Sequence, residues 1–189
     1  MGNPARAATA AATVAAVAFL AGCAEHVSGQ AEAADDEPAV ADDDVVVHQG
    51  PVDVLVEMLP GWQLGPDVLE GATTIVNPEA CGANFCDNLN VLVDPARGAS
   101  PDEFHAQSIA ELDELADVRS EREVELDGRV GYEVEYAGDR GHEYGDMRFL
   151  TRYTVADGEA VIVTYTARPD TFEEWRPDAE AMLESIEIR

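Results

Sequence analysis

The segment His142-Glu143-Tyr144 brings together three side chains that can do chemistry. An imidazole, a carboxylate and a phenol this close together can bind a metal ion or act as acid and base. One hypothesis is therefore a metal-assisted hydrolase that uses His142 and Glu143. The competing interpretation is a loop between two strands, because glycines bracket the segment and no second group of ligands accompanies it. We favour the loop, and keep His142, Glu143 and Tyr144 as candidate ligand-binding residues.

The rest of the chain carries no recognisable catalytic motif. It has no Gly-x-Ser-x-Gly turn, no His-Glu-x-x-His pair and no Gly-rich phosphate loop. His26 and His48 lie in or at the end of a polar N-terminal segment, and His105 falls on the apolar face of a predicted helix, where a partly buried structural histidine is typical. We therefore expect a protein that is not an enzyme, with no cofactor, no catalytic residue and no metal site.

Two tryptophans are candidates for binding an apolar ligand. Trp62 follows Pro60-Gly61 at the end of a predicted strand, and Trp175 lies on the apolar stripe of a predicted C-terminal helix. Large aromatic side chains can line a pocket for a lipid tail, but they also dominate ordinary cores. We favour core packing for both and keep Trp62 as a candidate ligand-binding residue.

Residues 1–22 have the pattern of a secretory signal. They contain one basic residue, Arg6, and no acidic one, and an almost entirely apolar run from Ala7 to Leu20 follows. A transmembrane helix needs about 20 apolar residues, so this run is short for a membrane span. A buried core helix is the alternative, which continuous apolarity at the N-terminus disfavours.

The end of this run, Leu20-Ala21-Gly22-Cys23, resembles the lipobox of bacterial lipoproteins. The resemblance implies that the peptide is cut before Cys23 and that the thiol carries a diacylglyceryl group. Two acyl chains hold a protein firmly at a membrane, whereas one is marginal. We therefore expect a lipid-anchored protein on the extracytoplasmic face of the cell membrane. An ordinary signal peptide with an accidental cysteine is the alternative.

The chain is strongly acidic. It has 39 acidic and 11 basic residues, a formal net charge of −28, and all of its basic residues are arginine. Arginine without lysine is typical of GC-rich coding, as in actinobacteria. This charge disfavours nucleic acid as a partner, because phosphates need basic patches. It also disfavours electrostatic binding to anionic lipids, so membrane attachment depends on the anchor.

Cys81 and Cys86 remain once Cys23 is assigned to the lipid. Nearby cysteines in an exported protein usually form a disulfide, which at this spacing stabilises by about 2 kcal/mol. A redox or metal role is the alternative, but the Cys-x-x-Cys spacing and a second ligand pair are missing.

Composition divides the chain into three parts. After the signal, residues 23–50 contain acidic runs and no aromatic residue, which predicts a disordered tether that begins at the lipidated cysteine. A calcium site there would lack the turn glycine and final glutamate of an EF-hand loop. Residues 51–189 have the size of one domain.

The domain alternates apolar and polar residues as an antiparallel sheet does. We expect strands at 52–58, 72–76, 88–94, 121–126, 129–136, 147–156 and 159–167. Asp127-Gly128 and Asp157-Gly158 each predict a hairpin turn. If the hairpins are adjacent, Glu133 and Glu135 can pair with Arg148 and Arg152 across the sheet.

Two helices complete the pattern. Ser100 and Glu103 predict a capping box with Pro101 at the first helical position. Thr171 and Glu174 could form a second box, but Pro177 favours a short turn followed by a helix that starts near it. The fold class is therefore α+β, an antiparallel sheet flanked by helices.

The order of these elements resembles the LpqN/LpqT-type lipoproteins of actinobacteria and, more distantly, PsbP-type domains. The motifs that carry the resemblance are Leu59-Pro60-Gly61-Trp62, Asp127-Gly128, Val163-Thr164-Tyr165 and Leu183-Glu184-Ser185-Ile186. The resemblance implies a PsbP-like domain with a noncatalytic accessory role in the cell envelope. Its partners would be envelope proteins or lipids. A carrier of lipid, with cargo held between sheet and helix, is the alternative.

Overall fold

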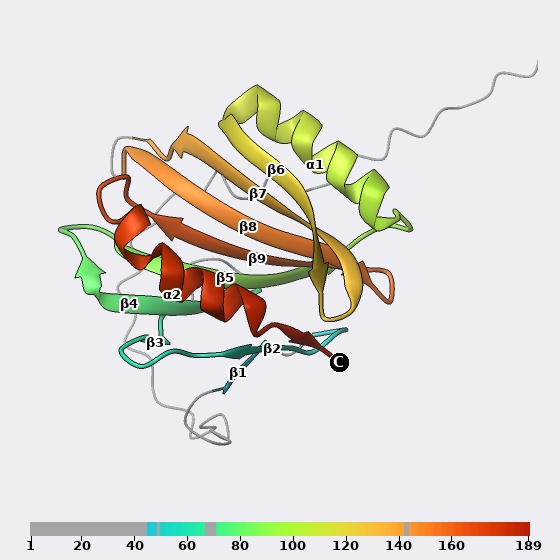
Figure 1. Ribbon diagram of the computed structural model, residues 1–189, viewed down its shortest axis with the longest axis horizontal. Coiled ribbons are helices and arrows are strands. Elements are labelled where there is room, and N and C mark those ends of the chain that lie inside the picture. The colour runs from blue at the N-terminus through green and yellow to red at the C-terminus, as the bar shows by residue number, and fades with distance from the viewer. Residues whose placement is uncertain (1–44, 49, 67–70, 142–143) are drawn as a thin grey trace, which may run out of the picture.

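The structure is a computed structural model that describes residues 45–48, 50–66, 71–141 and 144–189. Its main element is a seven-stranded antiparallel sheet (Figure 1) with the strand order β3-β4-β5-β9-β8-β7-β6. The strands are β3 (Gln63–Leu64), β4 (Ala72–Cys81), β5 (Cys86–Pro95), β6 (Asp117–Leu126), β7 (Arg129–Asp139), β8 (Asp146–Ala156) and β9 (Glu159–Ala167). The predicted α+β class is confirmed.

Two Asp-Gly turns close the hairpins β6–β7 and β8–β9. All four turn residues have positive φ, namely 48° at Asp127, 73° at Gly128, 52° at Asp157 and 88° at Gly158. Glycine adopts this conformation freely, and aspartate tolerates it better than most residues. Both predicted hairpins are therefore confirmed.

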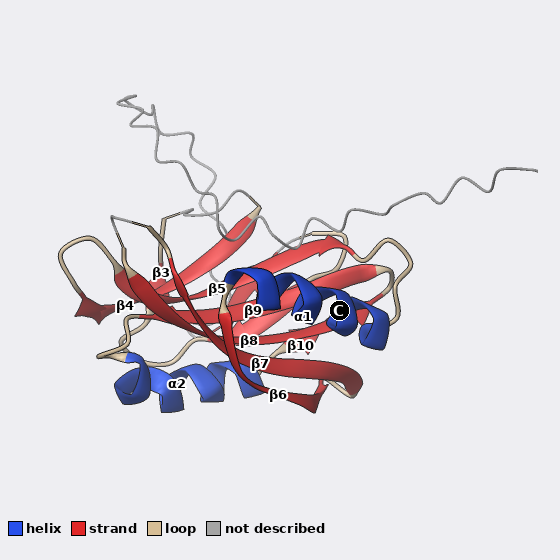
Figure 2. Ribbon diagram, turned by 90° about the horizontal axis from the view of Figure 1, so that it is seen from above, coloured by secondary structure: helices blue, strands red, loops and turns tan. Residues whose placement is uncertain are grey.

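The two helices cover opposite faces of the sheet, as Figure 2 shows. Helix α1 (Pro101–Leu115) begins with the predicted capping box, in which the Ser100 side chain accepts from the Glu103 backbone and the Glu103 side chain accepts from the Ser100 backbone. Helix α2 (Phe172–Glu184) lies across the other face. Each helix has its own apolar cluster against the sheet.

The start of α2 differs from the prediction. The helix runs through Pro177 from Phe172, and Thr171 makes no side-chain cap. Instead, the Thr171 hydroxyl donates back to the Arg168 carbonyl oxygen at 3.3 Å. Phe172 is fully buried and its ring stacks on Tyr165 at a centroid distance of 5.3 Å. This packing fixes the helix start ahead of the proline.

A smaller sheet joins the two ends of the domain. Its order is β1-β2-β10, formed by β1 (Val45–His48), β2 (Val54–Glu57) and β10 (Glu187–Ile188). The expected boundary between tether and domain at residue 50 is thus too late, because the apolar run 45–47 pairs with β2. His48, which we placed at the end of the tether, is buried and lies 3.1 Å from the Thr73 hydroxyl.

The polar side chains of β7 and β8 that point toward α2 form a charged network. The Glu133 carboxylate accepts from Arg122 and Arg152, each at 2.7 Å. Glu135 pairs with Arg148. The predicted cross-strand ion pairs are confirmed.

Several expectations fall outside the described residues. These are the signal segment, the lipobox Leu20-Ala21-Gly22-Cys23 and most of the tether. Within the described ranges, no helix is long and apolar enough to span a membrane.

Candidate binding site beneath helix α1

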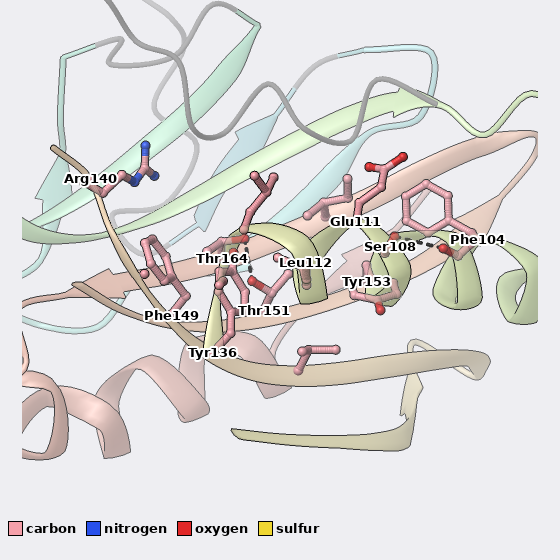
Figure 3. A pocket seen from close by; sticks show the side chains of 15 residues that line it. Phe104, Ser108, Glu111, Leu112, Tyr136, Arg140, Phe149, Thr151, Tyr153 and Thr164 are labelled. Atoms are coloured by element: carbon pink, nitrogen blue, oxygen red, sulfur yellow. Dashed lines mark hydrogen bonds between the residues drawn. The ribbon is translucent and has the colours of Figure 1, made fainter. Parts of the chain in front are cut away.

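A cavity of about 70 Å³ lies between α1 and the sheet (Figure 3). Its walls come from one face of α1 and from the strands β7, β8 and β9. Most of its lining is apolar or aromatic, and the residues that the figure labels are Phe104, Ser108, Glu111, Leu112, Tyr136, Arg140, Phe149, Thr151, Tyr153 and Thr164.

Uneven packing of α1 explains why space remains here. Phe104 and Ser108, in the first half of the helix, are its buried residues. Leu112 and Leu115, in the second half, line the cavity, and Leu115 is still 46% exposed. The helix is therefore held at its N-terminal half and roofs the cavity with its C-terminal half.

Two small residues, Gly138 in β7 and Ala116 at the end of α1, leave room in the cavity. Gly138 in β7 lines it opposite Ala116, and a Cβ atom added at Gly138 would lie 3.6 Å from the Ala116 Cβ. This is an ordinary van der Waals distance, and the φ of Gly138 is not in the left-handed region. The glycine is therefore not required by the backbone, and its effect is to leave room under the helix.

Polar groups lie at defined points of the lining. The hydroxyls of Thr151 and Thr164 hydrogen-bond each other at 3.0 Å across β8 and β9. The guanidinium of Arg140 lies 5.3 Å from the Phe149 ring centroid, and burial lowers the pKa of this arginine. The Glu111 Oε2 atom is shielded from solvent and has no hydrogen-bond partner.

An aromatic cluster borders the cavity at the N-terminal half of α1. The His105 ring stacks on Tyr132, and its Nδ1 atom lies 2.7 Å from the Tyr153 hydroxyl. The Tyr132 hydroxyl donates to Asp102 at 2.9 Å. Burial lowers the pKa of His105, with opposing contributions from the carboxylates of Glu121 and Asp102. The predicted structural role of His105 is confirmed, since it joins α1 to the sheet.

The two tryptophans lie on the other side of the sheet. Trp62 is 5% exposed, contacts Tyr165 edge-on at 6.4 Å and donates from Nε1 to Asp178 at 3.3 Å. Trp175 packs partly buried against the same apolar cluster under α2. Their core role is confirmed, and the structure does not bring Trp62 to the cavity.

The loop between β7 and β8 carries the other candidates. Tyr144 is 43% exposed, and its ring meets Phe85 edge-on at 6.0 Å. His142 and Glu143 lie outside the described residues. In the part of the chain that the structure describes, no group of three His, Cys, Asp or Glu side chains is placed to hold a metal ion.

Cys81 and Cys86 form the expected disulfide. They face each other at the end of the β4–β5 hairpin, with their Cα atoms 3.9 Å apart. The bridge therefore closes the loop that connects these strands.

The lining of the cavity was not predicted as a site. In the sequence, Tyr136, Phe149 and Tyr153 fall at alternating positions of their strands, and Phe104 and Leu112 are spaced eight residues apart on the helix. These spacings indicate apolar faces but do not indicate a cavity between them. Glu111 lies seven residues after Phe104, on the same face of α1, which was a usable signal for a charged group directed at the sheet.

No family model matches the chain, and no curated protein matches its sequence. Several solved structures share its fold. LpqN, involved in cell envelope biogenesis of Mycobacterium tuberculosis, has a TM-score of 0.57 at 15% identity, over 76% of this chain and 88% of that chain. PA94 of Pseudomonas aeruginosa has a TM-score of 0.54 at 14% identity, and the match covers 75% of this chain and 95% of that chain.

A third is cyanobacterial PsbP (CyanoP) from Synechocystis sp. PCC 6803. Its TM-score is 0.52 at 13% identity, over 80% of this chain and 96% of that chain. At such low identity the similarity is one of fold. The domain therefore has a PsbP-like fold, as its order of elements suggested.

Proposed function

We propose that this chain is a noncatalytic accessory binding protein of the cell envelope, whose domain holds a small apolar group in the cavity beneath α1. The observation that carries the proposal is the cavity itself. Protein interiors are normally packed with few voids larger than a water molecule. Here the space is lined mainly by aromatic and aliphatic side chains, as ligand pockets are.

The energetic argument favours an apolar occupant. Each Å² of apolar surface removed from water contributes about 25 cal/mol. An apolar cavity of this kind holds an apolar guest better than it holds water, which needs two to four polar partners. The Thr151 and Thr164 hydroxyls bond each other and so satisfy part of their own hydrogen bonding.

The location rests on the sequence. Leu20-Ala21-Gly22-Cys23 has the lipobox pattern, and a diacylglyceryl group on Cys23 would hold the domain at the extracytoplasmic face of the cell membrane. LpqN, which shares the fold, is involved in cell envelope biogenesis. Envelope lipids and envelope proteins are the partners that such a location offers.

Filling the cavity tests the binding proposal. Gly138→Leu places a side chain where the glycine leaves room, and should abolish binding of n-octanol to the full chain carrying Cys23→Ser, measured by calorimetry. Val130→Leu is the matched control, because Val130 is in the same strand, is 47% exposed and does not line the cavity. Equal binding by both variants would contradict the proposed site.

Cell fractionation tests the location. Cys23→Ser should release an intact folded domain from the membrane fraction. Continued retention of this variant in the membrane fraction would contradict the proposed lipid anchor. It would not bear on the proposed binding in the cavity.

A further inference from the structure

Among the described residues that line the cavity, Glu111 is the one acidic side chain. It lies on α1 and shares a helical face with Phe104 and Ser108, because residues three, four and seven apart align. Its Oε2 atom is shielded from solvent, and no donor among the described residues bonds it. A buried acceptor without a partner costs about 1–3 kcal/mol, so the site is complementary to a donor from outside the chain.

The surroundings of Glu111 leave its negative charge uncompensated. No described arginine or histidine lies within ion-pair distance of its oxygens. Burial raises the pKa of Glu111, and the neighbouring Glu114 adds to the effect. Arg140 lies at the opposite end of the lining in Figure 3. The two ends of the cavity therefore differ in charge.

We propose that Glu111 selects the ligand of this cavity, and that the ligand is an amine with a narrow apolar chain. Its ammonium group donates to Glu111 Oε2, and its chain lies along the aromatic wall. The inference rests on the proposed function, since it requires that the cavity binds an apolar group. It adds the chemical class of that ligand.

Two further observations favour a cation over a neutral donor. The chain has a net charge of −28, which attracts cations and repels anions during encounter. A charge-assisted hydrogen bond is roughly twice as strong as a neutral one. The amine should therefore bind with its ammonium head at Glu111 and its chain toward Phe149.

The size of the cavity limits the ligand. A cavity of about 150 Å³ holds benzene, and this one has about 70 Å³. An unbranched alkyl chain is narrower than an aromatic ring. An eight-carbon chain exceeds this volume, so it binds only if the second half of α1, which makes few buried contacts, moves outward from the sheet.

Three ligands of equal chain length test the inference. The full chain with Cys23→Ser is titrated calorimetrically with n-octylamine, n-octanol and n-octanoate near neutral pH. We expect n-octylamine to bind most tightly. In the Glu111→Gln variant, which keeps the shape of the side chain, affinity for n-octylamine should fall about tenfold and affinity for n-octanol should stay unchanged. Asp113→Asn is the matched control, because Asp113 is exposed on the same helix and does not line the cavity.

The possible results separate the two proposals. Equal binding of amine and alcohol, tighter binding of octanoate, or an unchanged amine affinity in Glu111→Gln would overturn the role of Glu111 and leave the apolar site standing. Failure of all three ligands to bind would overturn the site itself. Melting temperatures of both variants, compared with the parent chain, would expose a general loss of structure.

Discussion

The His105 ring on α1 lies flat against the Tyr132 ring on β7, with centroids 3.7 Å apart and planes 3° from parallel. This stack, together with the bond between His105 Nδ1 and the Tyr153 hydroxyl, anchors the half of α1 that is firmly packed. The other half roofs the cavity. The histidine therefore controls how well the helix is held.

The first prediction concerns pH. Burial lowers the pKa of His105 from its ordinary value of 6.5, so the folded protein accepts a proton less readily than the unfolded chain. Above pH 6.5 the imidazole is neutral in both states, so its titration does not change the stability. As the pH falls below 6.5 the unfolded chain binds the proton first, and the stability decreases until the pH reaches the lowered pKa of the folded state. His105→Phe keeps a ring over Tyr132 but cannot titrate there. Its melting temperature should fall less between about pH 7 and about pH 5 than that of the parent chain.

The remaining pH dependence of this variant has an identified source. Burial also lowers the pKa of His48, so some loss of stability should persist in His105→Phe. An NMR titration of the His105 imidazole gives the direct check. A midpoint above 6.5 would contradict the prediction.

The second prediction concerns Glu133, whose carboxylate lies between two arginines. Burial would raise the pKa of Glu133, but hydrogen bonds from Arg122 and Arg152 outweigh it and lower the pKa. Glu133→Ala leaves the Arg152 guanidinium, 7% exposed, without its closest partner. We expect a loss of about 3–5 kcal/mol in the free energy of unfolding, measured in urea near neutral pH.

Arg122→Ala is the matched control, because it removes the exposed arginine that also pairs with Glu133. The Arg122 side chain is 62% exposed, so its loss should cost no more than about 1 kcal/mol. Because the folded pKa of Glu133 is lowered, the stabilisation should be present above its unfolded pKa and should disappear as the pH falls through the folded one. Equal effects of the two substitutions would contradict the importance of burial.

Much of the fold could be predicted because its signals are local. Asp127-Gly128 and Asp157-Gly158 specify positive φ within two residues. Ser100 and Glu103 complete a cap within one turn. In contrast, the start of α2 depends on Phe172 packing against Tyr165, a contact between distant segments that the pattern Thr171–Glu174 does not report.

The cavity could not be predicted for a related reason. Alternation shows that Tyr136 and Phe149 share a face, but it does not show how closely a helix approaches that face. The space depends on Gly138 and Ala116 facing each other from separate elements. The spacing of seven residues from Phe104 places Glu111 on the buried face of the helix. That its Oε2 atom has no partner among the described residues depends on the surrounding fold and could not be predicted.

The third prediction concerns the Cys81–Cys86 bridge. Replacing both cysteines by serine should lower the free energy of unfolding by about 2 kcal/mol, because the unfolded chain regains the entropy of a short loop. Urea unfolding of the double variant under non-reducing conditions measures this loss. Cys23→Ser is the control and should leave the stability of the domain unchanged. An equal loss in the control would contradict a specific role for the bridge.

The fourth prediction concerns Asp87, a carboxyl group with 0% exposure next to the disulfide. Its Oδ1 atom accepts from the Arg168 backbone at 3.3 Å, whereas its Oδ2 atom has no partner. Burial raises the pKa of Asp87 despite the hydrogen bond from the Arg168 backbone and the nearby charge of the Arg168 side chain. Because the pKa of Asp87 is higher in the folded state than in the unfolded chain, the stability should fall as the pH rises through the unfolded pKa and then the folded pKa.

Asp87→Asn removes the charge and should therefore stabilise the domain by about 1 kcal/mol near neutral pH. The gain should vanish in acid, where the parent carboxyl is protonated. Urea unfolding at both pH values measures it, with exposed Asp113→Asn as the control, and a loss of stability near neutral pH would show that the ionised form is the one the fold requires.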